Sequence, residues 1–253
     1  MIDFDTKYNL MKEAGRILTR VLLDLEKEVK EGVELKKLDD LAEEMIRSYG
    51  AKPAFKNYKA PFARSIFPYT LCISLNDTIV HGYPKNGEYF KNGDIVKLDL
   101  GVIYKGFYSD AALTTYVGEI DELSMSLIQA TKKALKNAID VSLPDKTFGD
   151  IGWSIETTIE DSGFKVIKNL CGHDIGEYLH GDLQVLNFGD PGQGKKIKPG
   201  MFFTIEPMAS IGCEYAINED DYVFKTCDGS ISTHFEVTLV ILEDKNEVLT
   251  PII

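Results

Sequence analysis

The chain has 253 residues, of which 44% are hydrophobic and 27% are charged, so it can bury a sizeable core as an ordinary globular protein. Its formal net charge of −12 argues against nucleic acid or an anionic membrane as a partner, because both require clustered Lys and Arg. The sequence has no signal-peptide pattern and no apolar run near the ~20 residues of a membrane span.

The cysteines show no Cys-x-x-Cys spacing, which argues against a structural zinc site. They are Cys72, Cys171, Cys213 and Cys227. Because a chain of this size does not need disulfides to be stable, we expect reduced thiols and a cytoplasmic protein.

The first half of the chain predicts two helices followed by strands. Apolar residues recur at three- and four-residue spacing in both helical segments, and the second helix ends near a glycine. Three prolines among aromatic and basic residues predict an irregular loop before the strands. In chain order the predicted elements are helix 6–31, a second helix ending at Gly50, loop 51–69, strands 70–75 and 94–102, a turn at Lys105-Gly106 and strand 107–116.

The second half repeats this order without visible residue identity, which indicates a coarse internal duplication. Runs of helices followed by runs of strands favour an α+β fold over strict βαβ alternation. No Gly/Ser-rich linker divides the chain, so we expect residues 1–253 to form a single catalytic domain. The predicted elements are helices 121–142 and 148–162, then strands near 164–169, 201–206 and 234–242.

Five residues in short apolar or glycine-rich contexts form a complete set of ligands for a two-metal site. Bare carboxylates in apolar strands are costly, and divalent cations are the usual way to neutralise several that converge. One imidazole with four carboxylates suits manganese, iron, cobalt or zinc, and two such ions would generate a hydroxide near neutral pH. The five candidates are Asp99, Asp110, His173, Glu206 and Glu236.

Each carboxylate has a simpler explanation when it is taken alone. Asp99 and Asp110 are then turn or edge residues, Glu206 is a strand-end charge and Glu236 is a solvated strand position. Strand alternation nevertheless lets each strand pack one apolar face and offer its acid on the other. It is the conjunction of all five positions that predicts a metal centre.

These contexts, in this order, resemble the methionine aminopeptidases, which are metallopeptidases with the pita-bread fold. The resemblance runs from about Asn9 to Pro251 and includes Gly93-Asp-Ile-Val, Cys171-Gly-His-Asp-Ile-Gly, Lys198-Pro-Gly-Met and Phe203-Thr-Ile-Glu-Pro-Met. It implies an α+β fold of two pseudo-symmetric halves, whose strands form one curved antiparallel sheet with outer helices. It also implies two divalent metal ions held by the five candidates.

The resemblance also implies catalytic roles. His81 would face the backbone nitrogen of the substrate, and His180 would stabilise the carbonyl oxygen as it becomes tetrahedral. Glu206 would both bind metal and carry a proton from water to the departing amine. The alternatives are that His81 is an exposed turn residue and that His180 caps or packs. His234 has no family role and is expected to be structural or near the site.

The substrate pocket implied by the resemblance is apolar and suits the soft side chain of methionine. Its residues are Phe67, Cys72, Leu179 and Tyr222. Of these, Cys72 matches a residue of the family pocket, whereas the other three differ from the commonest family choice.

The implied activity is removal of the initiator methionine from nascent polypeptides or peptides, near the ribosome, by a monomer of the first type of these enzymes. The short span between His180 and Glu206 favours that type. One alternative is an X-Pro aminopeptidase or dipeptidase of the same fold, which usually carries a large extra N-terminal domain, whereas this chain begins its first helix within about ten residues. The other is a non-catalytic binding protein, which would typically have lost metal ligands.

Overall fold

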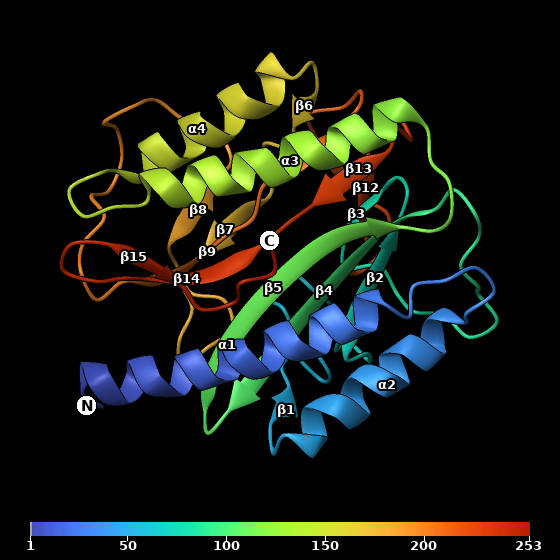
Figure 1. Ribbon diagram of the computed structural model, residues 1–253, viewed down its shortest axis with the longest axis horizontal. Helices are drawn as coiled ribbons and strands as arrows, with labels where there is room; N and C mark the ends of the chain where they lie inside the picture. Colours follow the sequence, from blue (N-terminus) through green and yellow to red (C-terminus); the bar gives the residue numbers. More distant parts are fainter. Residues whose placement is uncertain (1) are drawn as a thin grey trace.

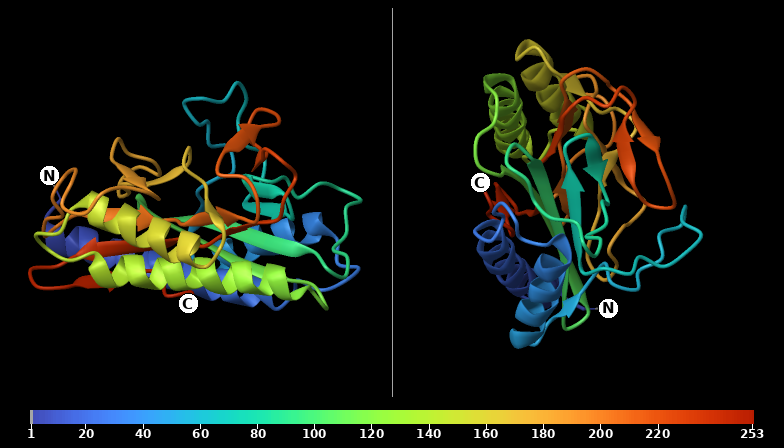
Figure 2. Two further views of the ribbon diagram at one scale, coloured as in Figure 1. Left: turned by 90° about the horizontal axis from the view of Figure 1, so that it is seen from above. Right: turned by 90° about the vertical axis from the view of Figure 1, so that its right-hand side faces the viewer.

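The computed structural model describes residues 2–253 and shows two pairs of helices with strands between them (Figure 1). The helices gather on one face, and most of the loops and short hairpins lie on the other (Figure 2). The helices are α1 (Phe4–Glu26), α2 (Leu35–Ser48), α3 (Glu122–Val141) and α4 (Phe148–Asp161). The strands are β1 (Lys52–Pro53), β2 (Leu71–Leu75), β3 (Thr78–Val80), β4 (Ile95–Tyr104), β5 (Phe107–Tyr116), β6 (Lys165–Val166), β7 (Cys171–His173), β8 (Gln184–Leu186), β9 (Phe202–Ile205), β10 (Met208–Ser210), β11 (Ala216–Asn218), β12 (Phe224–Thr226), β13 (Ser232–His234), β14 (Val237–Ile241) and β15 (Asn246–Val248).

Side-chain caps fix the start of three helices. The Asp3 carboxylate accepts a hydrogen bond from the amide of Thr6 at α1, and Thr147 and Asp150 form a capping box at α4. In α3 the capping residue is Asp121. These caps satisfy amide groups that have no partner inside the helix, so the predicted helices begin within two residues of where the sequence places them.

The first helix is shorter than predicted, because it ends at Glu26 instead of residue 31. The chain leaves the helix in a turn, and Gly32, with φ +78°, donates its amide to the carbonyl of Phe90 at 2.9 Å. Val29 stays buried although it lies outside the helix. The apolar spacing therefore continued past the helix end because the following turn also packs on the core.

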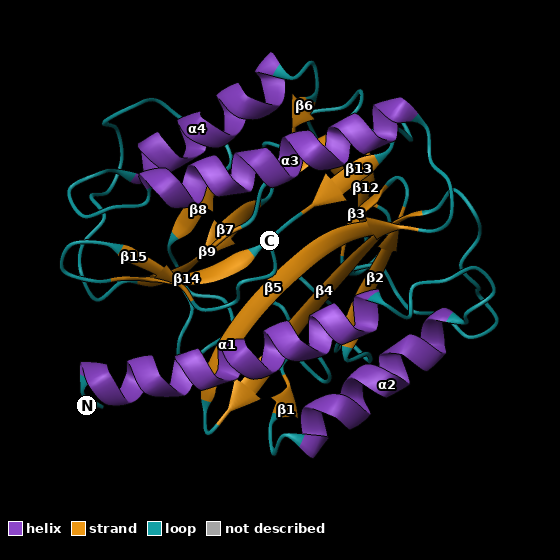
Figure 3. Ribbon diagram, viewed as in Figure 1, coloured by secondary structure: helices purple, strands orange, loops and turns teal. Residues whose placement is uncertain are grey.

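The β4–β5 hairpin is the longest paired segment of the sheet and matches the prediction (Figure 3). Lys105 and Gly106 both have positive φ, at 48° and 90°, as a tight two-residue hairpin turn requires. On β4, Leu98 and Leu100 join the core under α1 and α2, so Asp99 lies on the opposite face. The hairpin thus turns an acidic side chain away from the helices.

The two halves join beside this acid. Ala112 of β5 and Glu236 exchange backbone hydrogen bonds of 3.2 and 2.8 Å. Next to them the Thr238 hydroxyl donates to the carbonyl of Asp110 at 2.7 Å and accepts its amide at 3.0 Å. These contacts link the β4–β5 sheet to the sheet of β9, β14 and β15, so the strands of both halves form the curved antiparallel arrangement that was predicted.

Several short strands were not predicted, among them β3, β7, β8, β10, β11 and β12. They form small sheets in the orders β13-β10-β6, β11-β12-β3 and β7-β8, in which β10 pairs with β6 and β12 pairs with β3 across long separations in the sequence. The predicted strand 234–242 is interrupted, because Phe235 and Glu236 separate β13 from β14. Three-residue strands are too short for a period of two to be recognised in the sequence.

The expectation that all thiols are reduced is wrong for one pair. Cys213 and Cys227 form a disulfide with Cα atoms 5.9 Å apart, whereas Cys72 and Cys171 are free thiols within the described chain. The β11–β12 hairpin, pairing Ala216 with Thr226, brings the two half-cystines together. Their sequence spacing alone contains no signal for that register.

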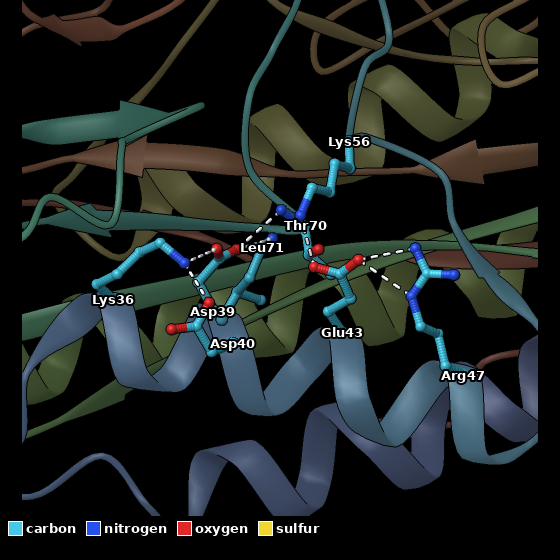
Figure 4. A network of polar contacts seen from close by, with 8 residues as sticks. All are labelled: Lys36, Asp39, Asp40, Glu43, Arg47, Lys56, Thr70 and Leu71. Carbon is cyan, nitrogen blue, oxygen red and sulfur yellow. Dashed lines mark hydrogen bonds and ion pairs between the residues drawn. The ribbon is translucent and has the colours of Figure 1, made fainter.

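A polar network ties α2 to the strand next to the site (Figure 4). Buried Asp39 accepts hydrogen bonds from the amides of Thr70 and Leu71, at 2.8 and 2.9 Å, and pairs with Lys36. Burying a carboxylate is tolerable when it is hydrogen-bonded in this way. The network fixes the point where the loop 51–69 enters β2.

None of the helices formed by residues 2–253 is both long and apolar enough to cross a membrane.

Candidate metal centre

A cavity of about 590 Å³ contains all of the sequence-predicted site residues. Its floor is the face of β4 and β5 that points away from α1 and α2, and its walls come from the loops and short hairpins of the other layer. The lining combines buried acids with aromatic and aliphatic side chains, as is typical of sites that bind small apolar groups beside a reactive centre.

Adjacent strands bring the candidate ligands together. On the β4–β5 hairpin, Asp99 lies opposite Ala112 and Asp110 lies opposite Gly101, so the two acids are diagonal neighbours on one face. His173 ends β7 and Glu206 follows β9 directly. Glu236 lies in the short gap between β13 and β14, where the two halves join.

The candidate ligands form two groups that share one residue. Oxygens of Asp99, Asp110 and Glu236 lie within 4.8 Å of one another, and so do ligand atoms of His173, Glu206 and Glu236. The Nε2 atom of His173 is 3.8 Å from Glu206 Oε1 and 3.9 Å from Glu236 Oε1. Glu236 therefore belongs to both groups.

Burial and mutual repulsion disfavour ionisation of the clustered carboxyl groups. Burial raises the pKa of Asp99 to about 7. Burial, followed by repulsion from neighbouring carboxylates, raises the pKa of Asp110, Glu206 and Glu236 well above the ordinary value. Three atoms of this group, Asp99 Oδ1, Asp110 Oδ1 and Glu236 Oε1, are buried without a hydrogen-bond partner among residues 2–253.

Divalent cations fit this donor set. The partnerless oxygens and the mutual repulsion both call for positive charge, and hard oxygen donors bind such ions well. Burial lowers the pKa of His173 to about 4, which keeps its ring neutral, and its Nδ1 lies 3.1 Å from the carbonyl of Asp174. That contact assigns the proton to Nδ1 and leaves the Nε2 lone pair facing the carboxylates.

The raised carboxyl pKa values predict a different pH dependence of stability with and without metal. Histidines of the unfolded chain lose their protons near pH ~6.5, so the offset that they give to the acids fades above that pH. Asp99, with an ordinary pKa of 3.8 and a folded pKa of about 7, binds more proton when folded. Its contribution to the free energy of unfolding is therefore lost as pH rises through 7. Bound cations keep the acids ionised and remove this loss.

We therefore expect the melting temperature of the metal-free protein to fall as pH is raised from 6.5 to 8. The melting temperature of the Mn²⁺-loaded protein should stay constant over the same interval. Differential scanning fluorimetry with EDTA or with excess Mn²⁺ measures both. Asp99→Asn is the matched control, because it removes one titrating group and should flatten the metal-free slope. A metal-free melting temperature that rises over this interval would contradict the assignment.

Two histidines lie at different depths of the cavity. His81, with φ +59°, ends the segment after β3, and its Nδ1 is 3.2 Å from the carbonyl of Tyr222. His180 lies at the exposed mouth, with its ring centroid 4.4 Å from that of His173 and its Nδ1 2.9 Å from the hydroxyl of Tyr58. Desolvation lowers the pKa of both rings, and for His180 the neighbouring imidazoles lower it further.

The four predicted pocket residues lie in one wall of the cavity. Phe67, Cys72, Leu179 and Tyr222 are each buried and line it. The rings of Phe67 and Tyr222 meet edge to face, with centroids 5.2 Å apart. Burial, with the nearby acids Asp99 and Asp110, raises the pKa of Cys72, so its thiol stays neutral and apolar.

Residues of the loop 51–69 that were not predicted as site residues complete the mouth of the cavity. Phe62 is 57% exposed and stacks on His81 with centroids 6.4 Å apart. The loop is closed by Asp221, which accepts the amides of Arg64 and Ser65 at 2.6 and 2.7 Å. The only signal in the sequence was the clustering of aromatic residues among prolines, which does not say where the loop folds back.

Comparison with known proteins decides the family. The family model "Metallopeptidase family M24" matches residues 9–243. The chain belongs to metallopeptidase family M24. Membership of this family implies divalent metal ions, in agreement with the acidic cluster in the cavity.

Two similar proteins match this M24 member end to end. A methionine aminopeptidase from Clostridium perfringens is 40% identical, and the match covers 97% of this chain and 96% of the relative. The crystal structure of a methionine aminopeptidase from Thermotoga maritima is 38% identical, with 99% of both chains covered and a TM-score of 0.93. The predicted family resemblance and pita-bread fold are confirmed.

A prolidase from Pyrococcus furiosus shares the fold alone. It is 20% identical with a TM-score of 0.76, and the match covers 97% of this M24 chain but 64% of the prolidase. The X-Pro alternative is therefore not favoured by the comparisons.

Proposed function

We propose that this protein hydrolyses the first peptide bond of peptides and polypeptides that begin with methionine. The observation that carries the proposal is that the five candidate metal ligands and the four apolar pocket residues line one cavity. The end-to-end similarity to methionine aminopeptidases supports the same activity. Under this proposal residues 1–253 act as one catalytic domain.

Two divalent cations fit the two groups of ligands. Asp99 and Asp110 would hold one, His173 and Glu206 the other, and Glu236 both. The donor set suits manganese, iron, cobalt or zinc. When bound, such ions polarise the scissile carbonyl and lower the pKa of a water molecule.

Glu206 is the residue proposed to carry the proton. Its carboxylate follows β9, and its own carbonyl is held by the Asn187 amide at 3.0 Å, which limits movement of the backbone. The Thr204 hydroxyl donates to Oε1 at 3.3 Å. In the loaded centre the cations would keep this carboxylate ionised, so it could take a proton from the attacking water and return it to the leaving amine.

His180 is proposed to stabilise the developing oxyanion. The Tyr58 hydroxyl donates to Nδ1 in this arrangement, so Nε2 carries the ring proton and is free to donate toward the cavity. The lowered pKa keeps the ring neutral, which allows a hydrogen bond to the oxyanion without a charge that would repel the cations. His81, which also lines the cavity and is less exposed than His180, is proposed to face the backbone nitrogen of the substrate.

The proposal also covers the natural substrate, the oligomeric state and the cellular location. We propose nascent polypeptides near the ribosome as substrates, a monomeric enzyme and a cytoplasmic location. A net charge of −12 supports the absence of a nucleic-acid partner. The apolar lining of Phe67, Cys72, Leu179 and Tyr222 supports methionine as the first residue, because an unbranched thioether fills irregular apolar slots.

Profiling X-Ala-Ser peptides at saturating Mn²⁺ or Co²⁺ tests the function. We expect Met at the first position to be cleaved at least about tenfold faster than Leu, since one methylene of misfit costs ~1–3 kcal/mol. A parallel Met-Pro and Ala-Pro pair tests the X-Pro alternative. Preference for a residue other than Met would refute methionine specificity and leave the aminopeptidase chemistry standing.

A further inference from the structure

His234 is a buried imidazole whose hydrogen bonds are unaccounted for. The residue is 2% exposed, and within residues 2–253 neither Nδ1 nor Nε2 has a hydrogen-bond partner. Leaving a buried polar group unpaired costs roughly 1–3 kcal/mol, so such a group usually serves a purpose beyond packing.

The backbone of His234 is fixed on both sides. On β13 it pairs with Met208 of β10, and the hydroxyl of Thr114 accepts its amide at 2.9 Å and donates to its carbonyl at 2.7 Å. His234 lies two residues before Glu236, so both side chains leave the extended chain on one side and line the cavity. The imidazole is held in place by the sheet, with little freedom to move.

The ring lies next to the candidate proton carrier. Nε2 of His234 is 3.8 Å from Oε2 of Glu206. The other oxygen, Oε1, accepts from Thr204 and is 3.8 Å from Nε2 of His173. Two imidazoles thus approach the two oxygens of one carboxylate at the same distance, and they come from strands of different sheets, β7 and β13.

We infer that His234 is a positioning residue that donates its Nε2–H to Glu206 Oε2. An ionised carboxylate only accepts hydrogen bonds, so the nitrogen that faces it must carry the proton. The present separation exceeds a hydrogen bond by about 1 Å, and such bonds commonly shorten when a reactive centre is loaded. The inference deepens the proposed function, because it rests on Glu206 as proton carrier.

This hydrogen bond would give the two oxygens of Glu206 different partners. With Oε2 held by His234, Oε1 is directed toward the side of the cavity where His173 and Glu236 lie. Outer partners of metal-binding carboxylates orient them, and their loss typically lowers affinity or activity 10–100-fold. His234 therefore acts on the reaction through Glu206 and does not need to touch the substrate.

Three variants separate this role from simple packing. We expect His234→Ala to lower kcat about 10–100-fold with little change in KM. His234→Gln, which keeps an N–H donor, should recover most of the loss. Thr233→Val is the matched control on the same strand, because its hydroxyl contacts Thr131 at 2.7 Å on the helix side. It should lower the melting temperature and leave kcat unchanged.

A direct readout comes from ¹⁵N NMR of the histidine side chains in the Zn²⁺-loaded protein. We expect the His234 Nε2 to be protonated and not bound to metal, with a resonance that moves in Glu206→Gln. An unchanged kcat in His234→Ala, absence of rescue by glutamine, or a metal-bound His234 nitrogen would each overturn the inference. If the wild-type protein cleaved no methionyl peptide, the proposed function would be refuted. The ¹⁵N resonance of His234 Nε2 would still show whether His234 contacts Glu206.

Discussion

A Glu236→Gln variant is expected to lose the paired metal site and at least about 10³-fold in kcat/KM. Glu236 belongs to both ligand groups, so under the proposed function its replacement removes a negative donor that two cations would share. Metal-based charge stabilisation is worth several kcal/mol in the transition state, and each 1.36 kcal/mol is a factor of ten in rate. Glutamine keeps the volume of the side chain, so the change acts through charge and not through a cavity.

Metal content after dialysis and kcat/KM at saturating Mn²⁺ measure this effect. Glu243→Gln is the control, because this acid is exposed and lies outside the cavity. Without metal, the Glu236→Gln protein should be at least as stable as the wild type, since it removes a repulsive buried charge. A variant that kept two tightly bound ions and full activity would show that Glu236 is not a ligand.

A His180→Ala variant is expected to lose about 10²–10³-fold in kcat while it keeps its metal ions. Removing one donor to an oxyanion typically costs this much. Tyr58→Phe should cause a smaller loss, because it removes the hydroxyl that sets the orientation and tautomer of His180 but leaves the ring in place. Metal analysis alongside kcat distinguishes this role from coordination. Stoichiometric loss of metal in His180→Ala would make the residue a ligand, in line with its closeness to Asp110 and His173.

The elements that the sequence predicts best are those determined by residues close together in the sequence. The long helices follow apolar spacing and side-chain caps, and the β4–β5 hairpin follows from alternation and the Lys105-Gly106 turn. The face occupied by Asp99 could also be predicted, because alternation along β4 assigns Leu98 and Leu100 to the helix side.

The parts that could not be predicted depend on contacts between distant segments. The pairing of Ala112 with Glu236 joins residues more than a hundred positions apart, and no local pattern encodes it. The same holds for Asp221 closing the loop of Arg64 and Ser65. The candidate ligands were found only because each occurs in a recognisable motif; His234 has no such motif, and its interest depends on lying near Glu206.

The disulfide makes the wall of the proposed substrate pocket sensitive to reducing agents. Cys213 and Cys227 enclose the segment that carries Asp221 and Tyr222, and Cys227 is exposed to solvent. The cross-link of a loop of this length contributes on the order of 3 kcal/mol by restricting the unfolded chain. A thiol reductant removes that restraint from the residues that close the pocket loop and support Phe67. Kinetic constants measured in buffers with and without reductant therefore describe two chemically different proteins.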